Sequence, residues 1–278
     1  MSTNNSIKDI NEFIDNGSIT SQQILVVSLC FIFNMLDGFD ITAMAVVASP
    51  VSVDLALTPD LLGWIFSFAL AGMMVGAMAL APIADIIGRR ALIILSLMIV
   101  GISVIMTSKV ESLTPFMLLR FISGMGAGAL LASQASLAAE YSPDKYRALS
   151  VAIVTAGYPT GAMMTSVVAG YILPEYGWRM MFLFGGVVTV SMVIVAWLMI
   201  PESLKYLIEK KPNNALEKIN KILLKLNAPS ISELPPSNND REVTVSMIGN
   251  MRMLLSPKFR RLSLMLWTPY LCAFGTLY

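Results

Sequence analysis

The sequence contains no histidine and few charged residues. Lys, Arg, Asp and Glu make up 13% of its 278 residues, against about 25% in ordinary soluble domains. Without histidine the chain lacks the commonest metal ligand and general base, which disfavours haem and zinc-hydrolase sites and leaves proton transfer to Asp, Glu, Arg or Tyr. Because 56% of the residues are hydrophobic, we expect the chain to bury its apolar surface in lipid.

Cysteine is also scarce, and the net charge is close to zero. Cys30 and Cys272 lie far apart in apolar runs, so we expect small buried hydrophobic residues and no disulfide framework. A net charge of +1 gives no indication of nucleic-acid binding. We find no nucleophile paired with a base, no metal-ligand cluster and no phosphate-binding loop. The sequence therefore predicts neither an enzyme nor a protein with a bound cofactor or metal.

Six apolar stretches are long enough to be membrane-spanning helices, which require roughly 20 residues. Unbroken runs favour helices over barrel strands, whose residues alternate. The sequence therefore predicts an all-α membrane protein with a six-span domain over residues 24–200. The predicted spans are 24–47, 62–83, 91–108, 113–138, 148–172 and 179–200.

The positions of Lys and Arg predict the orientation. With the N-terminus inside, sixteen of these residues are cytoplasmic, Lys109 and Arg179 are outside, and Arg120 is within a span. The positive-inside rule then places the N-terminal tail, residues 1–23, in the cytoplasm. This tail lacks the apolar core of a cleaved signal peptide.

After the sixth span the chain becomes polar and basic, and we expect a cytoplasmic central loop over residues 201–261. An amphipathic helix is predicted within it from the spacing of Ala215, Leu216, Ile219, Ile222, Leu223 and Leu226. The sequence leaves open whether this loop is a solvated linker or meets lipid. We interpret residues 262–278 as the truncated start of a seventh span, and expect a missing C-terminal half as a partner.

Three ionisable residues lie inside predicted spans: Asp37, Asp40 and Arg120. Each costs at least about 2.5 kcal/mol at a helix centre, so we expect a function or a structural ion pair. At about 1.5 Å per residue, Asp37 and Arg120 lie at a similar depth, and Asp37 shares a helix face with Asp40. Weaker candidates are the buried amides Asn34 and Gln134, which often serve only as hydrogen-bond partners between helices.

Small residues in spans four and five predict close contacts or bends. Gly124 and Gly128, with Arg120, recur every four residues, so we expect another helix to pack there. In span five we expect Gly157, Pro159 and Gly161 to interrupt the helix, as a hinge, a ligand contact or a packing feature.

Charged residues also gather at the cytoplasmic ends of the spans. The turn between spans two and three contains Asp85, Gly88, Arg89 and Arg90. It allows an acidic group to pair with basic ones as helices slide. Glu140 begins a similar charged cluster at the inner end of span four.

These motifs resemble the major facilitator superfamily over the whole apolar region. PIADIIGRR is similar to that superfamily's loop signature, with Pro82 in place of the first Gly and Ile86 in place of an Arg. Four further segments are likewise typical of members: the stretch from Arg120 to Gly128, GYPTG, GWRMMFLFGG and PESLKYL. The resemblance implies a six-helix N-terminal bundle built as a 3+3 inverted repeat.

Within the superfamily, DGFD at Asp37 to Asp40 is similar to the first-span motif of the aromatic acid:proton symporters. That resemblance implies uptake of benzoate-like or hydroxybenzoate-like organic anions with protons across the bacterial inner membrane. It assigns the family's important residues to Asp37, Asp40, Arg120, Glu140 and Asp85. One alternative keeps the fold but changes the cargo to another organic anion, a sugar or a drug. A second alternative is an inactive half-transporter with only a structural role.

Overall fold

The computed structural model describes residues 19–226, 228–231, 234, 256–257, 259–265 and 268. All regular structure in these residues is helical, which confirms the predicted all-α class. Between α3 and α5 the chain passes through a π-helical turn, η1, a 3-10 turn, η2, and the short helix α4. The elements are α2 (Ser21–Asp54), α3 (Pro59–Val75), η1 (Gly76–Leu80), η2 (Ala81–Ile83), α4 (Ala84–Ile87), α5 (Arg89–Thr107), α6 (Leu113–Tyr141), α7 (Asp144–Met199), α8 (Leu204–Lys210) and α9 (Ala215–Lys225).

Local sequence explains where several helices begin. Thr20 and Gln23 form a capping box at the start of α2, in which the Gln23 side chain accepts the N–H of Thr20 at 2.8 Å. Pro59 occupies the first turn of α3, where its missing N–H costs nothing. Gly88 separates α4 from α5 with a φ of 96°, a conformation that favours glycine.

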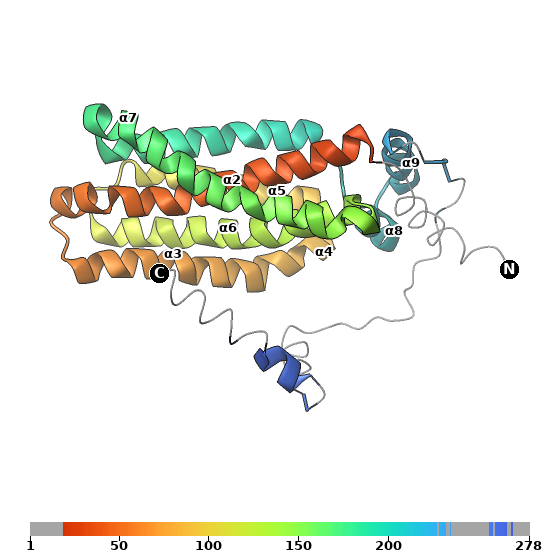
Figure 1. The fold of residues 1–278 in the computed structure, drawn as a ribbon, viewed down its shortest axis with the longest axis horizontal. Coiled ribbons are helices and arrows are strands. Elements are labelled where there is room, and N and C mark those ends of the chain that lie inside the picture. Colours follow the sequence, from red (N-terminus) through yellow and green to blue (C-terminus); the bar gives the residue numbers. More distant parts are fainter. Residues whose placement is uncertain are drawn as a thin grey trace. The chain divides into compact units, whose positions relative to one another are not determined.

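Helix α7 contains two of the predicted spans. Its 56 residues include one position with non-helical geometry, Gly177, with φ 73° and ψ −179°. The chain reverses there, and the second segment runs back along the bundle (Figure 1). Five helices of the described residues, α7 among them, are long and apolar enough to cross a membrane. The reversal therefore yields six spanning-length segments from five helices.

The closest helix contacts follow the symmetry of an inverted repeat. α2 packs against the first segment of α7, where a Cβ on Gly161 would lie 1.8 Å from the Met35 carbonyl oxygen. α3 packs against α6, where a Cβ on Gly128 would lie 2.1 Å from the Met73 carbonyl oxygen. In a 3+3 repeat, spans one to three correspond to spans four to six. The pair of spans one and five (α2 and the first segment of α7) then corresponds to the pair of spans four and two (α6 and α3). The predicted packing groove at Gly124 and Gly128 is confirmed.

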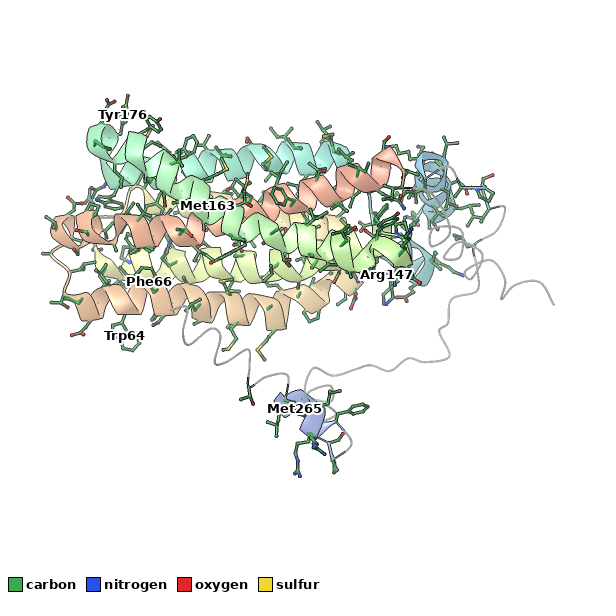
Figure 2. All side chains as sticks on the ribbon, viewed as in Figure 1. Trp64, Phe66, Arg147, Met163, Tyr176 and Met265 are labelled. Carbon is green, nitrogen blue, oxygen red and sulfur yellow. The ribbon has the colours of Figure 1, made fainter. Side chains whose placement is uncertain are left out.

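Three clusters of buried apolar residues, two large and one small, lie in the interior of the described residues, while other faces of the bundle expose large apolar side chains. Cys30, Phe33 and Leu137 belong to the cluster at the α8 and α9 end. Trp64 of α3 and Met163 of α7 are exposed, as their labelled positions show (Figure 2). Such faces suit lipid or another protein surface.

The residues of the predicted amphipathic helix form α9. Its apolar face, which includes Ile219 and Leu223, packs with Leu204 and Leu207 of α8 in the first apolar cluster. The apolar side of α9 is thus covered by protein, and its lysines remain exposed.

The remaining predicted segments are described only in part. In the unit formed by residues 238–278, positions 260–265 are helical. Residues 269–278 of the predicted seventh span, including Cys272, and residues 1–18 of the tail lie outside the described residues.

Candidate functional site

A buried ion pair joins α2 to α6 within the bundle. The two terminal nitrogens of Arg120 donate to the two carboxylate oxygens of Asp40 at 3.3 and 3.2 Å. Arg120 is 2% exposed and Asp40 8% exposed. The similar depth of Asp37 and Arg120 in the sequence did not decide which carboxylate on this helix face pairs with Arg120, and in the structure it is Asp40. Depth alone does not fix how each helix is rotated about its axis.

An aromatic cluster covers the other side of the guanidinium. The carbon Cζ of Arg120 lies 4.8 Å from the ring centroid of Phe182, which contacts Phe116 and Trp178 at 5.9 and 6.0 Å between centroids. The Nε of Arg120 is buried and has no hydrogen-bond partner among the described residues. Sequence reasoning missed Phe182, whose only signal was the aromatic-rich start of span six.

Asp37 occupies a very different environment from Asp40. It is 3% exposed, and neither carboxylate oxygen has a hydrogen-bond partner in the described part of the chain. A buried ionised carboxylate without partners is strongly unfavourable. The position is therefore suited to a group that is neutralised by a proton or paired by an incoming ligand.

The two predicted amides lie at different depths. The Asn34 side chain donates to the Val154 carbonyl oxygen at 2.7 Å, and its own oxygen is buried without a partner in the described residues. Gln134 is fully buried, and both of its amide atoms lack partners there. Gln134 is 14 residues from Arg120 on α6, about 21 Å along the axis. The structure therefore gathers Asn34, Asp37 and Asp40 along α2 and leaves Gln134 far from the ion pair.

A second charged cluster lies at the end of the bundle beside α8. Arg89 pairs with Glu140 at 2.9 Å, and the Ser203 hydroxyl donates to Glu140 at 2.6 Å. Asp85, on α4, is exposed at the same end. The two charged clusters noted in the sequence, the turn and the region of Glu140, are thus joined by one ion pair.

Glu202 organises this cluster, and sequence reasoning gave it no role. Its carboxylate accepts the backbone N–H groups of Arg90 and Ser203 at 3.1 and 3.0 Å. Its carbonyl oxygen accepts the Tyr141 hydroxyl at 2.7 Å. An acidic group at the start of α5 complements the partial positive charge of a helix N-terminus. The sequence signals were its place in the PESLKYL motif and its position directly after Pro201, at the end of a long apolar helix.

The expected break at Gly157, Pro159 and Gly161 is absent. In α7 the backbone is helical through these residues, and its one non-helical position is Gly177. Gly157 and Gly161 instead lie against the α2 backbone, at the carbonyl oxygens of Phe31 and Met35. The small residues therefore permit close helix packing.

The outer end of the predicted topology carries a further ion pair. Arg179 pairs with Asp54 at 2.6 Å, and the Trp178 indole donates to the same carboxylate oxygen at 3.3 Å. These contacts fasten the end of α2 to the turn within α7. In the described residues no group of three or more Cys, Asp or Glu side chains could hold a metal ion.

Comparison with known proteins identifies the family of this arrangement. A family model described as Major Facilitator Superfamily matches residues 30–278. The chain is 27% identical to the 4-hydroxybenzoate transporter PcaK of Acinetobacter baylyi, over 99% of this chain and 60% of that protein. It is also 27% identical to a gallate transporter of Pseudomonas putida, over 97% of this chain and 59% of that protein.

A solved structure shows the same fold. The proton:xylose symporter XylE, bound to 6-bromo-6-deoxy-D-glucose, superposes with a TM-score of 0.68 and 18% identity, over 75% of this chain and 50% of that chain. The chain thus spans about three fifths of the length of the curated relatives it matches. The predicted fold and the resemblance to aromatic acid transporters are confirmed. The chain belongs to the major facilitator superfamily of multi-pass membrane transporters.

Proposed function

We propose that this chain belongs to a symporter that imports aromatic carboxylates together with protons across the bacterial inner membrane, with its N-terminus in the cytoplasm. The relatives named as 4-hydroxybenzoate and gallate transporters support the cargo. The distribution of Lys and Arg supports the orientation. The observation that carries the proposal is the buried Asp40–Arg120 pair, one helical turn from Asp37, whose carboxylate has no hydrogen-bond partner in the described part of the chain.

Arg120 is the proposed anion-binding group. A planar guanidinium holds a carboxylate at two points, as it holds Asp40 in this structure. A substrate carboxylate can therefore take the place of Asp40, with its aromatic ring near the ring of Phe182. Exchange of one carboxylate for another conserves the charge balance of the buried site.

Asp37 and Asp40 are the proposed proton carriers. When a substrate anion takes Arg120, Asp40 loses its counter-charge and binds a proton. Asp37 has no hydrogen-bond partner among the described residues, so a proton at this position removes the cost of burying its negative charge. Asn34 and Gln134 are proposed as polar contacts for substrate or protons, since each has a buried amide atom without a partner in the described residues.

The charged cluster at the cytoplasmic end is the proposed inner gate. It comprises Asp85, Gly88, Arg89, Arg90 and Glu140, of which Arg89 and Glu140 are paired. Gly157, Pro159 and Gly161 are proposed as part of the interface through which α2 and the first segment of α7 move together during the transport cycle. A second six-helix unit is the proposed partner, because the relatives are longer than this chain.

The test is uptake of labelled 4-hydroxybenzoate, gallate and xylose by membrane vesicles that contain the protein, with and without an imposed pH gradient. We expect saturable accumulation of the aromatic acids that requires an acidic exterior. An uncharged sugar offers no negative group to Arg120, so xylose should stay at background. Xylose accumulation without aromatic acid accumulation contradicts the proposed cargo, and uptake that ignores the pH gradient contradicts proton coupling.

A further inference from the structure

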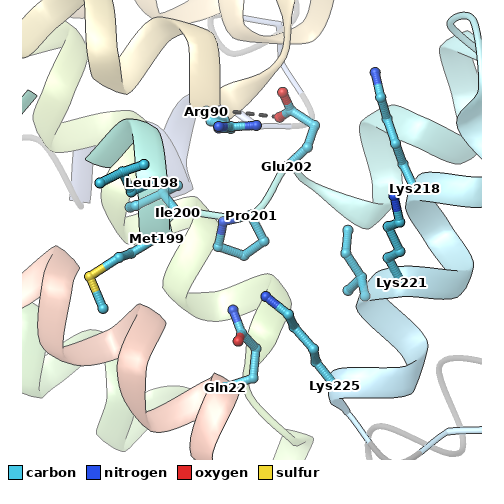
Figure 3. Close-up of a pocket in the computed structure, with 11 residues that line it drawn as sticks. Gln22, Arg90, Leu198, Met199, Ile200, Pro201, Glu202, Lys218, Lys221 and Lys225 are labelled. Carbon is cyan, nitrogen blue, oxygen red and sulfur yellow. Dashed lines mark hydrogen bonds between the residues drawn. The ribbon is translucent and has the colours of Figure 1, made fainter. Parts of the chain in front are cut away.

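A basic pocket of about 230 Å³ lies between the start of α2, the end of α7 and α9 (Figure 3). Its apolar part consists of Leu198, Met199, Ile200, Pro201 and Ile222. Its polar lining has four cationic side chains and one carboxylate: Arg90, Lys218, Lys221, Lys225 and Glu202. This excess of positive charge suits an anionic ligand.

The single lining carboxylate offsets only one of the four positive charges. Glu202 accepts two backbone N–H groups, those of Arg90 and Ser203, and so is already engaged at the start of α5. Outside the lining, Glu217 pairs with Lys221 at 2.8 Å. The hydrogen bond from Lys221 lowers the pKa of Glu217. One of the three lysines is therefore partly compensated by an exposed pair, and the pocket remains cationic.

A buried donor in the pocket lacks a partner. Gln22, in the first turn of α2, is 9% exposed, and its amide nitrogen has no hydrogen-bond partner among the described residues. The Gln22 side chain lines the pocket on the same side as Lys225 (Figure 3). An unsatisfied buried donor costs about 1–3 kcal/mol, which a bound acceptor recovers. The start of a helix adds partial positive charge of its own.

The surroundings of the pocket indicate what kind of anion it takes. Leu198 and Met199 line the pocket, and Leu198 is 67% exposed beside the exposed Trp197 and Ile194 of α7. Apolar surface next to a cationic pocket at the end of a spanning helix fits a molecule with an acyl chain and an anionic head. Basic pockets at the cytoplasmic side of membrane helices bind such head groups.

We propose that this pocket binds the phosphate head group of an anionic phospholipid of the cytoplasmic leaflet. The lysines of α9 and the amide of Gln22 contact the phosphate, and the acyl chain lies along the end of α7. Because the apolar face of α9 is covered by protein, this helix serves to hold lysines over the pocket. The site relies on the proposed orientation of the chain and is independent of the transported solute.

The test is native mass spectrometry of the purified, delipidated protein titrated with phosphatidylglycerol or phosphatidylcholine. The pocket variant is Lys218→Gln/Lys221→Gln/Lys225→Gln. Its matched control is Lys205→Gln/Lys210→Gln/Lys211→Gln, which removes the same charge from α8 and its end, outside the pocket lining. Each basic residue near an anionic head group contributes about fivefold in affinity. We expect phosphatidylglycerol to bind the wild type and the control variant, and the pocket variant, which lacks three such residues, to bind it roughly a hundredfold more weakly.

Gln22→Met keeps the size of the buried side chain and removes the donor. It should also weaken phosphatidylglycerol binding, while thermal unfolding without lipid checks that each variant is folded. Inorganic phosphate tests whether the pocket is instead a site for a soluble anion. We expect it not to displace bound phosphatidylglycerol at millimolar concentration. Equal binding by the pocket and control variants, equal binding of phosphatidylcholine, or full displacement by phosphate would each overturn the proposal.

Discussion

The carboxylate of Glu202 lies against the backbone of Gly88, where an added Cβ would come within 2.5 Å of its nearer oxygen. The same glycine has a φ of 96°, which side chains rarely tolerate. Two independent constraints thus require glycine at the point where α4 ends and α5 begins. The contact joins residues that are more than a hundred positions apart in the chain.

Gly88→Ala should therefore slow transport more than it weakens substrate binding, because the proposed inner gate is distant from Arg120. We expect strain of about 1–3 kcal/mol from the backbone alone, with displacement of Glu202 in addition. Maximal uptake rate and apparent affinity are measured in parallel. Gly170→Ala is the control, since a Cβ there meets nothing within 4 Å. A change in affinity as large as the change in rate would place Gly88 in the binding site.

Asp37→Asn should abolish accumulation driven by a pH gradient while leaving the protein folded. The substitution removes the proton site but breaks no ion pair, because Asp37 has no partner among the described residues. Exchange of labelled for unlabelled substrate across the membrane needs no net proton movement and should persist. Accumulation at the wild-type level in this variant would exclude Asp37 as a proton carrier.

Asp40→Asn should behave differently, because it leaves the Arg120 charge buried without its partner. Removing one member of a buried ion pair costs about 3–5 kcal/mol. We expect a lower unfolding temperature in detergent for Asp40→Asn than for Asp37→Asn. If a substrate carboxylate replaces Asp40, a saturating aromatic acid should restore much of the lost stability, and benzyl alcohol, which has no carboxylate, should not.

Arg120→Lys keeps the charge but loses the planar fork that contacts both oxygens of a carboxylate. We expect apparent affinity for the aromatic acid to fall by at least about tenfold, a loss near 1.4 kcal/mol. The measurement is the concentration dependence of uptake, with protein in the membrane quantified by immunoblot. An unchanged affinity would limit Arg120 to a structural role.

The sequence predicted the helical class and the family because unbroken apolar runs and local motifs encode them. It also located Asp37, Asp40 and Arg120, since charge within an apolar run is conspicuous. It left the partner of Arg120 undecided, because rise per residue gives depth, whereas the choice between Asp37 and Asp40 depends on helix rotation and tilt. It also predicted a break at Pro159 from composition, although close packing against α2 keeps α7 helical there. The hydrogen bond between Glu202 and Arg90 joins distant segments of the chain, so no local sequence pattern predicts it.

The glycine contacts have a mechanical consequence. At Gly161 and Gly128 one helix backbone contacts another directly, with no side chain between them. We therefore expect two rigid helix pairs: α2 with the first segment of α7, and α3 with α6. Asp40 belongs to the first pair and Arg120 to the second, so their ion pair holds the two helix pairs together. Spin-label distances should change on substrate binding between α2 and α6, and stay constant between α3 and α6. A substrate that breaks the Asp40–Arg120 ion pair would thereby allow the two helix pairs to move relative to each other.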